Sequence, residues 1–274
     1  MPTSAPGLYT QRASNYSEGR PDYPLGVVEV LRTHGVTPGA VVIDLGSGTG
    51  AMSRLLAGNG YRVVAVEPNA AMRGVALLGG AGGVAALAEV LPFDDHCVDA
   101  VVVAQALHWF DPEPSTRSIW QVLRPRTGVL VGVWNERRVR TPFEHEVEAA
   151  LLRDAPDYGP SRAHDDAGAV FERFAAGHRC RTDEYANFQD LDEDRHVARF
   201  LSPSWAPPPG TQQAARLRDE LVAVFARHGH AGRVRLGYRT VVLSTVPGST
   251  CGRSPAADEP PSGSGPGDQR LERR

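Results

Sequence analysis

An apolar run that breaks directly into closely spaced glycines constrains the fold of this 274-residue chain more than any other feature. Residues 41–50 read VVIDLGSGTG, and Met52, Leu55 and Leu56 follow at the spacing of one helix face. A buried strand, a tight glycine turn and a helix, in this order, form the opening unit of a doubly wound α/β sheet. We therefore expect a parallel sheet, with a ligand site at the turn where this strand ends.

Further strand and helix patterns alternate along the chain with short links, as they do in α/β domains. Asn69 and Asp111 are residues that can cap the first turn of a helix, and each precedes an apolar helical pattern. A clear helical stripe also includes Leu217, Leu221 and Val224, and Gly229 ends it. The expected strands cover residues 41–45, 62–66, 84–88, 98–107, 128–134 and 234–246.

Segments with a weaker pattern suggest how the chain is divided. Residues 153–181 are polar, and we expect mostly loop there, with one helix near residues 167–176. Half of the last 28 residues are Pro, Gly or Ser, so we expect this tail to be disordered. The expected parts are an N-terminal arm or lid (1–37), a cofactor-binding core (38–136), the C-terminal part of the same domain with acceptor-side insertions (137–246) and the tail (247–274).

The composition of the chain limits the kinds of molecule that we expect it to bind. All 29 basic residues are Arg and the formal net charge is −3, which argues against broad electrostatic binding to nucleic acid or to an anionic membrane. The N-terminal residues lack the apolar region of a secretory signal, and the longest uncharged apolar run, residues 74–88, is shorter than the roughly 20 residues of a membrane helix. The three cysteines show no C-x-x-C spacing. We therefore expect a cytoplasmic protein without a metal ion, with no nucleic-acid or membrane partner.

Two acidic residues distinguish the glycine turn from a plain dinucleotide-binding loop. Gly46, Gly48 and Ala51 do match the G-x-G-x-x-A form of that loop. Asp44, however, lies two residues before Gly46, where a carboxylate repels a pyrophosphate but suits an ammonium or sulfonium group. Glu67 follows the second strand and is placed to accept both hydroxyls of a ribose. The pattern favours a ligand with an adenosine ribose and a cationic tail.

Together these motifs resemble those of the class I S-adenosylmethionine-dependent methyltransferases. VVIDLGSGTG is similar to the first motif of the family, and VVAVEPN, at residues 63–69, is similar to the second, with Glu67 as the acidic residue for the ribose. AEVLPF, which begins at Ala88, resembles the motif on the adenine side. The remaining matches are to the fourth and fifth strands of the family, at residues 97–110 and 123–135.

Three pieces of the sequence further resemble a subgroup of the family that is like trans-aconitate methyltransferase and acts on small molecules. These pieces are the pattern around Tyr16, Arg20 and Tyr23, the HWF at residues 108–110, and Trp134-Asn135. The resemblance implies a Rossmann-like sheet of seven strands with an antiparallel final strand. It also implies a small organic acceptor for the methyl group.

The resemblance assigns S-adenosyl-L-methionine as the cofactor. The residues that it implies for cofactor binding are Asp44, Gly46, Ser47, Gly48, Gly50, Glu67, Pro68, Ala88, Glu89 and Gln105. The acceptor-side candidates are Tyr16, Arg20, His108 and Trp109. His108 is also the candidate for a general base, which is needed only if the acceptor must lose a proton. A carboxylate acceptor needs none.

One departure from the family pattern keeps alternatives open. Many relatives carry an acidic residue two positions before Glu89, where this chain has Leu87, so adenine recognition is expected to fall to Glu89 or to the backbone near Ala88. Three functions follow from the sequence: a methyltransferase acting on a small organic acceptor such as a carboxylate, a nucleotide-dependent oxidoreductase on a similar fold, and a non-catalytic cofactor-binding module.

Overall fold

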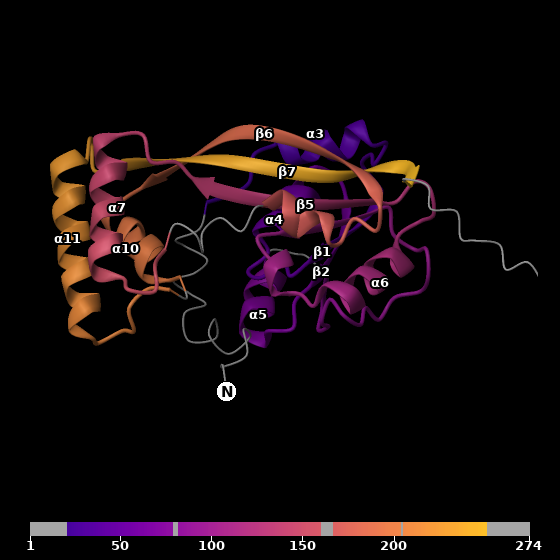
Figure 1. Cartoon of the computed structure of the whole chain (residues 1–274), viewed down its shortest axis with the longest axis horizontal. Helices are drawn as coiled ribbons and strands as arrows, with labels where there is room; N and C mark the ends of the chain where they lie inside the picture. Colours follow the sequence, from indigo (N-terminus) through magenta and orange to yellow (C-terminus); the bar gives the residue numbers. More distant parts are fainter. Residues whose placement is uncertain (1–20, 79–81, 160–166, 204, 251–274) are drawn as a thin grey trace, which may run out of the picture.

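The chain folds around one seven-stranded sheet (Figure 1). In the computed structural model, which describes residues 21–78, 82–159, 167–203 and 205–250, the strand order is β3-β2-β1-β4-β5-β7-β6. Strand β7 pairs antiparallel with both of its neighbours, whereas the other neighbouring strands are parallel. This topology confirms the expected doubly wound α/β sheet with an antiparallel final strand. The strands are β1 (Val41–Leu45), β2 (Arg62–Val66), β3 (Gly82–Val84), β4 (Ala100–Ala104), β5 (Val129–Arg137), β6 (His178–Leu191) and β7 (Val234–Thr250).

Helices cover both faces of the sheet because successive strand residues point to opposite sides. On one face, Val42 and Val102 pack with helices α3 (Gly26–Thr33) and α4 (Ala51–Gly58). On the other face, Ile43 and Val101 pack with α6 (Pro112–Val122) and α9 (Ala167–Glu172). Burial on both sides explains why the central strands read as unbroken apolar runs in the sequence.

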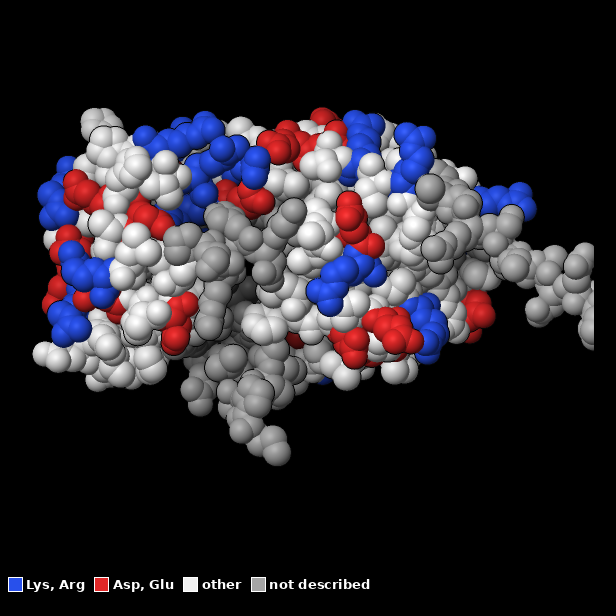
Figure 2. All heavy atoms as spheres, in the orientation of Figure 1, with Lys and Arg blue, Asp and Glu red and all other residues white. Residues whose placement is uncertain are grey.

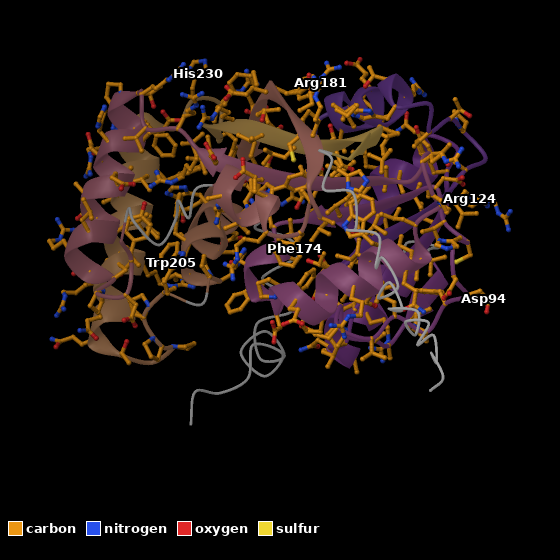
Figure 3. All side chains as sticks on the ribbon, turned by 45° about the vertical axis from the view of Figure 1, so that its right-hand side comes forward. Asp94, Arg124, Phe174, Arg181, Trp205 and His230 are labelled. Atoms are coloured by element: carbon orange, nitrogen blue, oxygen red, sulfur yellow. The ribbon has the colours of Figure 1, made fainter. Side chains whose placement is uncertain are left out.

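A third apolar cluster joins three helices to the ends of β6 and β7. The helices are α7 (Pro142–Asp154), α10 (Glu193–Leu201) and α11 (Gln212–His228), and they form the left-hand part of the molecule in Figure 1. In the turned view of Figure 3, Trp205 lies with this helical cluster, whereas Phe174 lies in the core under the sheet. Strand β7 contributes to both clusters, with Val241 and Leu243 in the core under the sheet and Leu236 and Tyr238 in the helical cluster.

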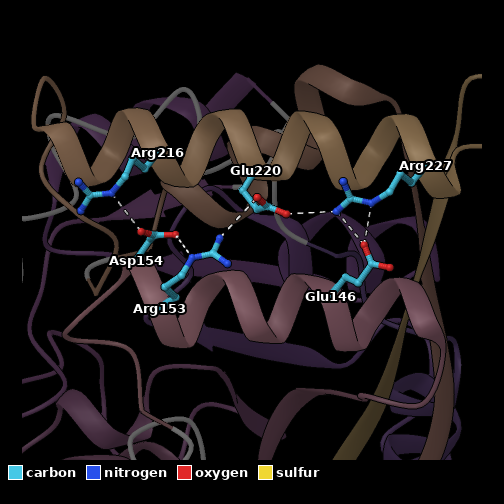
Figure 4. A network of polar contacts seen from close by, with 6 residues as sticks. All are labelled: Glu146, Arg153, Asp154, Arg216, Glu220 and Arg227. Carbon is cyan, nitrogen blue, oxygen red and sulfur yellow. Dashed lines mark hydrogen bonds and ion pairs between the residues drawn. The ribbon is translucent and has the colours of Figure 1, made fainter.

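Ion pairs tie α7 to α11 along their length (Figure 4). Arg227 contacts Glu146 at 2.8 Å and Glu220 at 3.1 Å, and Asp154 contacts Arg153 at 2.9 Å and Arg216 at 3.3 Å. Arg227 and its two partners are about a third to a half exposed, so each of their pairs contributes on the order of 0–1 kcal/mol, whereas Asp154 is buried. The buried leucine and phenylalanine side chains between the helices therefore supply most of the stability of this part.

Several elements differ from the sequence-based expectation. The third strand covers Gly82–Val84 rather than 84–88, and β4 is shorter than the predicted 98–107 because Leu107 begins a short helix, η1 (Leu107–Trp109). The prediction of mostly loop over 153–181 missed the end of α7 and the beginning of the 14-residue strand β6. Helix α10 was not predicted.

Near both ends of the described chain, helix and strand structure reaches further than the sequence predicts. Within the predicted arm, residues 26–33 form α3, whose buried valines belong to the core. Strand β7 runs to Thr250, so the predicted start of the tail at residue 247 is four residues too early. Residues 1–20 and 251–274 lie outside the described part of the chain.

Charges of both signs are interspersed on the face shown in Figure 2. None of the helices in the described ranges is long and apolar enough to cross a membrane.

Candidate cofactor and acceptor site

The three glycines of the turn all have a left-handed backbone, but each for a different local reason. A side chain at Gly46 (φ +71°) would lie 2.7 Å from the Cβ of Ala106, so this glycine allows the turn to approach the end of β4. A side chain at Gly50 (φ +81°) would meet Ala76 at 2.9 Å, so this glycine allows α5 (Ala70–Leu78) to pack against the start of α4. At Gly48 (φ +55°), the space where a side chain would lie contains no protein atom within 4 Å.

The turn forms one wall of a large cavity. The empty space between its walls amounts to about 1250 Å³, a figure that includes the part open to solvent. The lining comes from the carboxyl ends of β1, β2, β4 and β5, as expected for a ligand site in an open parallel sheet. It includes Asp44, Gly46, Ser47, Gly48, Glu67, Pro68, Leu87, Ala88, Glu89, Gln105, Trp109, Asn135 and Arg199.

Asp44 brings a buried carboxylate to the cavity. Its Oδ2 accepts a 2.5 Å hydrogen bond from the hydroxyl of Ser53, while its buried Oδ1 has no hydrogen-bond partner. Burial raises the pKa of this carboxyl to about 6, partly offset by the hydrogen bond from Ser53, and Glu67 raises it further. A cationic group beside Oδ1 would satisfy the unpartnered oxygen and stabilise the charged form.

Two backbone N–H groups hold the carboxylate of Glu67 in place in the cavity wall. Its Oε2 accepts from the backbone N–H of Gly48 at 3.0 Å, and its Oε1 accepts from that of Asn69 at 2.8 Å. Burial raises the pKa of Glu67, and these two hydrogen bonds oppose the rise. Each carboxylate oxygen can accept a second hydrogen bond, so Glu67 remains able to bind a pair of hydroxyls.

Gln105 occupies a strained position at the end of β4. Its φ is +58°, a left-handed conformation that is uncommon for residues other than glycine and that often marks functional sites. Its backbone N–H donates to the carbonyl of Val133, and its side-chain amide donates to the carbonyl of Asn135 at 3.1 Å. These two bonds fix Gln105 in the cavity wall between β4 and β5.

Asn135 and Asn187 attach the N-terminal segment to the rim of the cavity. Both side-chain amides donate to the carbonyl of Asp22, at 3.3 Å from Asn135 and 2.7 Å from Asn187. Pro21 and Tyr23, on either side of Asp22, line the cavity. Part of the predicted arm therefore does contribute to the site.

On the side expected for adenine, Ala88 is buried and Leu87 is 54% exposed, and both line the cavity. The carboxylate of Glu89 also lines it and accepts a hydrogen bond from the backbone N–H of Asp111 at 3.1 Å. Met72, on α5, lies in the same lining. This wall thus combines apolar contact with one carboxylate.

Some predicted residues lie elsewhere. Gly50 is outside the cavity lining and packs against α5. His108 is exposed on η1 and is also outside the lining, although its neighbour Trp109 is part of it. Tyr16 and Arg20 lie outside the described residues.

The sequence reading missed Arg199, which reaches the lining from α10. It lies 64 residues beyond Asn135 in a segment without clear periodicity, so spacing alone gave no link to the cavity. The available signal was the helix start itself: Asp192 caps α10 by accepting from the backbone N–H of Arg195, and two acidic residues follow it. Among the described residues, no group of three or more His, Cys, Asp or Glu side chains is arranged to hold a metal ion.

Comparisons with known proteins agree with this geometry. The model of the methyltransferase domain family matches residues 43–131. An uncharacterised methyltransferase from Mycobacterium tuberculosis is 41% identical over 150 residues, covering 51% of this chain and 56% of that protein, so the chain spans little more than half the length of this relative. An uncharacterised methyltransferase from Schizosaccharomyces pombe is 30% identical over 238 residues, covering 85% of this chain and 94% of that protein.

A solved structure shares both the fold and some of the sequence. This is a candidate type II methyltransferase from Anaeromyxobacter dehalogenans, with a TM-score of 0.64 and 25% identity, covering 83% of this chain and 97% of that one. The similarity to the yeast protein extends over nearly its whole length, and the strand order is that of the methyltransferase fold. The chain therefore belongs to the class I S-adenosylmethionine-dependent methyltransferases.

Proposed function

We propose that this protein transfers a methyl group from S-adenosyl-L-methionine to a small organic acceptor. The observation that carries the proposal is the pair of buried carboxylates, Asp44 and Glu67, on either side of the glycine turn in one cavity. An acidic pair suits a ligand with a positive charge and ribose hydroxyls, and it disfavours a pyrophosphate.

The residues present fit the cofactor. The unpartnered Oδ1 of Asp44 suits the ammonium group of the methionine part, and Glu67 suits the ribose hydroxyls. The open space beside Gly48 allows a ligand to approach the main chain. Ala88 and Met72 offer an apolar contact for the adenine ring, with Glu89 nearby as an acceptor for its amino group.

When bound, S-adenosylmethionine supplies a methyl group on a positively charged sulfur, which leaves with its electron pair as a neutral thioether. The protein then has to hold the acceptor atom in line with the methyl carbon and exclude water, which can lower the barrier by up to roughly 11 kcal/mol. Tyr23, Gln105 and Trp109 are the lining residues that we assign to this task, because they lie toward β4 and the N-terminal segment. His108 is exposed and outside the lining, which does not support a role as a base.

A small acceptor is supported by the recessed position of the site, in a cavity that is partly open to solvent, and by the mixed charges on the visible surface. The absence of nucleic-acid and membrane partners, a cytoplasmic location, and membership of the subgroup that is like trans-aconitate methyltransferase remain predictions from the sequence.

Calorimetry with S-adenosylhomocysteine and with NADH tests the cofactor assignment. We expect S-adenosylhomocysteine to bind and NADH not to bind, because the carboxylates face the cavity. Binding of NADH alone would establish the oxidoreductase alternative. Binding of S-adenosylhomocysteine with no methylated product from a panel of carboxylates, phenols and amines, followed by mass spectrometry, would favour the non-catalytic alternative.

A matched pair of glycine variants tests the position of the site. Gly48 and Gly177 both have a left-handed backbone and open space beside the Cα, but only Gly48 lines the cavity. Replacing either by Ala should cost about 1–2 kcal/mol of stability through backbone strain. Only Gly48→Ala should also weaken S-adenosylhomocysteine binding, by about tenfold or more, because its methyl group enters the ligand space. Equal binding by both variants would show that the site lies elsewhere.

A further inference from the structure

Strand β6 leaves one long edge of the sheet without a partner strand. It covers His178–Leu191, is the last strand in the sheet order, and pairs with β7 on its inner side. No other segment in the described part of the chain pairs with its outer side, which borders the sheet at the top of Figure 1. The strand at the opposite border, β3, has three residues. The backbone N–H and C=O groups on the outer side of β6 can therefore accept a further strand.

The usual structural barriers to such pairing are weak in β6. Folded proteins protect an edge strand by making it short, by a proline or a bulge, by a covering segment, or by charged side chains. The sequence of β6, HRCRTDEYANFQDL, contains no proline, and the irregularity in its pairing with β7 lies at its first residues, between His178 and Cys180. Its charged side chains are Arg179, Arg181, Asp183, Glu184 and Asp190. The arrangement of these charges therefore decides whether the edge repels or accepts another strand.

The charges of β6 are ordered so that the strand is complementary to a copy of itself. The arginines at 179 and 181 come first, and Asp183 and Glu184 follow them. An antiparallel copy runs in the opposite direction, so its acidic residues lie opposite the arginines. Opposite charges across a strand pair stabilise it, and like charges destabilise it. A strand protected against its own copies would carry charges of one sign, so the observed order favours self-pairing.

One register of this pairing is selected by the same residues. Opposing side chains in an antiparallel pair lie on the same face of the sheet, so odd-numbered residues oppose odd-numbered ones. With Arg181 opposite the partner's Asp183, the ion pair occurs twice and Thr182 lies on the twofold axis. A shift to the next register in either direction places Arg181 opposite its own copy, or Asp183 opposite its own copy. The selected register pairs residues 178–186 and leaves out Asn187, whose amide already donates to Asp22.

Arg181 and Asp183 are placed to form these contacts. Within one chain, Nη2 of Arg181 lies 2.7 Å from Oδ1 of Asp183, so the two side chains are neighbours on one face of the strand. The side chain of Arg181 is 49% exposed, and it lies at the upper border of the molecule in Figure 3. Pairing with a copy therefore extends the existing ion pair into a network of four charges across the axis.

We propose that β6 is a dimerisation edge, at which residues 178–186 pair antiparallel with the same residues of a second copy of this chain. The two sheets then form one continuous sheet. Because the axis reverses the strand direction, the two cavities, at the carboxyl ends of the parallel strands, lie at opposite edges of that sheet. A single strand pair makes a small interface, so we expect a dissociation constant on the order of micromolar.

Charge reversal in the full-length protein tests the pairing, with the dimer dissociation constant measured by analytical ultracentrifugation. Arg181→Asp and Asp183→Arg each place like charges opposite one another, so each should raise the constant by about tenfold or more over the wild type. An equimolar mixture of these two variants should form a heterodimer with nearly the wild-type constant, because two arginines of one chain then face two aspartates of the other.

Two further variants separate the interface from the fold. The double variant Arg181→Asp/Asp183→Arg restores opposite charges both within a chain and across the axis, so it should dimerise like the wild type. Arg235→Asp is the matched control, because Arg235 forms a similar exposed pair with Asp190 at 2.6 Å, outside residues 178–186. It should leave the dissociation constant within about twofold. Melting curves establish that each variant is folded.

A disulfide experiment locates the twofold axis. In a protein whose native cysteines are replaced by Ala, Thr182→Cys should form a disulfide between subunits under mild oxidation, since opposing Cβ atoms lie about 4.5–5.5 Å apart. Ala186→Cys should not, because it lies opposite His178 of the partner subunit. The dimerisation edge is wrong if the wild type stays monomeric at about 100 μM. It is also wrong if the mixed variants associate no better than each alone, or if a dimer forms without the Thr182→Cys cross-link.

Discussion

At the scale of single residues, Asp44 shows how the fold prepares a charge for a ligand. Its carboxyl is fully buried, one oxygen lacks a partner, and its pKa rises from 3.8 to about 6. The folded protein therefore binds a proton between about pH 4 and 6 that the unfolded chain does not bind. The charged form destabilises the ligand-free fold above pH 6, by on the order of 3 kcal/mol, and this effect is relieved as the pH falls toward 4.

Asp44→Asn should remove this pH dependence. We expect the thermal stability of the ligand-free wild type, relative to the variant, to increase as the pH falls from 7.5 to about 4.5, because the wild type gains a proton and the amide does not. The wild-type affinity for S-adenosylhomocysteine should fall below about pH 6, since the ligand ammonium favours the charged carboxylate. The variant should bind about tenfold more weakly at pH 7.5, without this decline. Melting curves and calorimetry over the pH range measure both effects, and parallel profiles for the two proteins would contradict the role given to Asp44.

The sequence predicts a ligand-binding residue when that residue lies within a recognisable motif. Asp44, Gly48 and Glu67 follow from the strand–turn–helix pattern, because the carboxyl ends of neighbouring parallel strands meet at one edge. Gly50 shares the pattern but serves helix packing, and only the atoms around it reveal this. Arg199 comes from a distant helix, and its position depends on tertiary packing that no spacing rule describes.

At the scale of elements, strands β5 and β6 share an anchor for the N-terminal segment. They are separated by β7 in the sheet, yet Asn135 and Asn187 both donate to the carbonyl of Asp22. Asn187 also donates to Oδ1 of Asn135, and Thr240 on β7 donates to the same atom. The three strands thus hold the segment that brings Tyr23 to the cavity.

Asn187→Ala should loosen this anchor without removing a cavity-lining side chain. We expect faster hydrogen exchange in the segment around residues 22–28, and S-adenosylhomocysteine affinity lower by about threefold to tenfold, because Tyr23 is held less firmly. Asn59→Ala is the control, since its side-chain amide bonds a carbonyl at the end of α4 instead. Unchanged exchange in the Asn187 variant would show that Asn135 alone is a sufficient anchor.

Elements were predictable from sequence where burial imposes a strong pattern. Strands β1, β2 and β5 are covered on both faces and read as apolar runs. Strand β6 was missed because it lies at the sheet edge and mixes exposed and half-buried residues. Helix α7 has a clear start signal in the sequence: Pro142 follows Thr141, whose side chain accepts from the backbone N–H of Glu144 in a capping box.

At the scale of the whole molecule, the direction of β7 carries its last residue, Thr250, away from the cavity. Tyr238, early in β7, pairs with Arg137 at the end of β5, whereas Ser244 pairs with Val131 nearer its start. Thr250 therefore lies toward the opposite edge of the sheet from the carboxyl ends that line the cavity. The pairing of β7 with β6 shifts register between Thr245, which pairs with Cys180, and Thr250, which pairs with His178. Pro247 and Gly248 lie within this break. This break explains why the sequence placed the end of the strand too early.

Two truncations test whether the cavity is independent of the C-terminal end. Removal of residues 251–274 should leave both the melting temperature and the affinity for S-adenosylhomocysteine unchanged, because β7 and every described lining residue remain. Removal of residues 247–274 also deletes the pairing between His178 and Thr250, so we expect a melting temperature lower by a few degrees at the same affinity. Calorimetry and melting curves on the two proteins separate stability from binding. A marked loss of affinity in the shorter deletion would mean that residues beyond Thr250 take part in the ligand site, despite the direction in which β7 leaves the cavity.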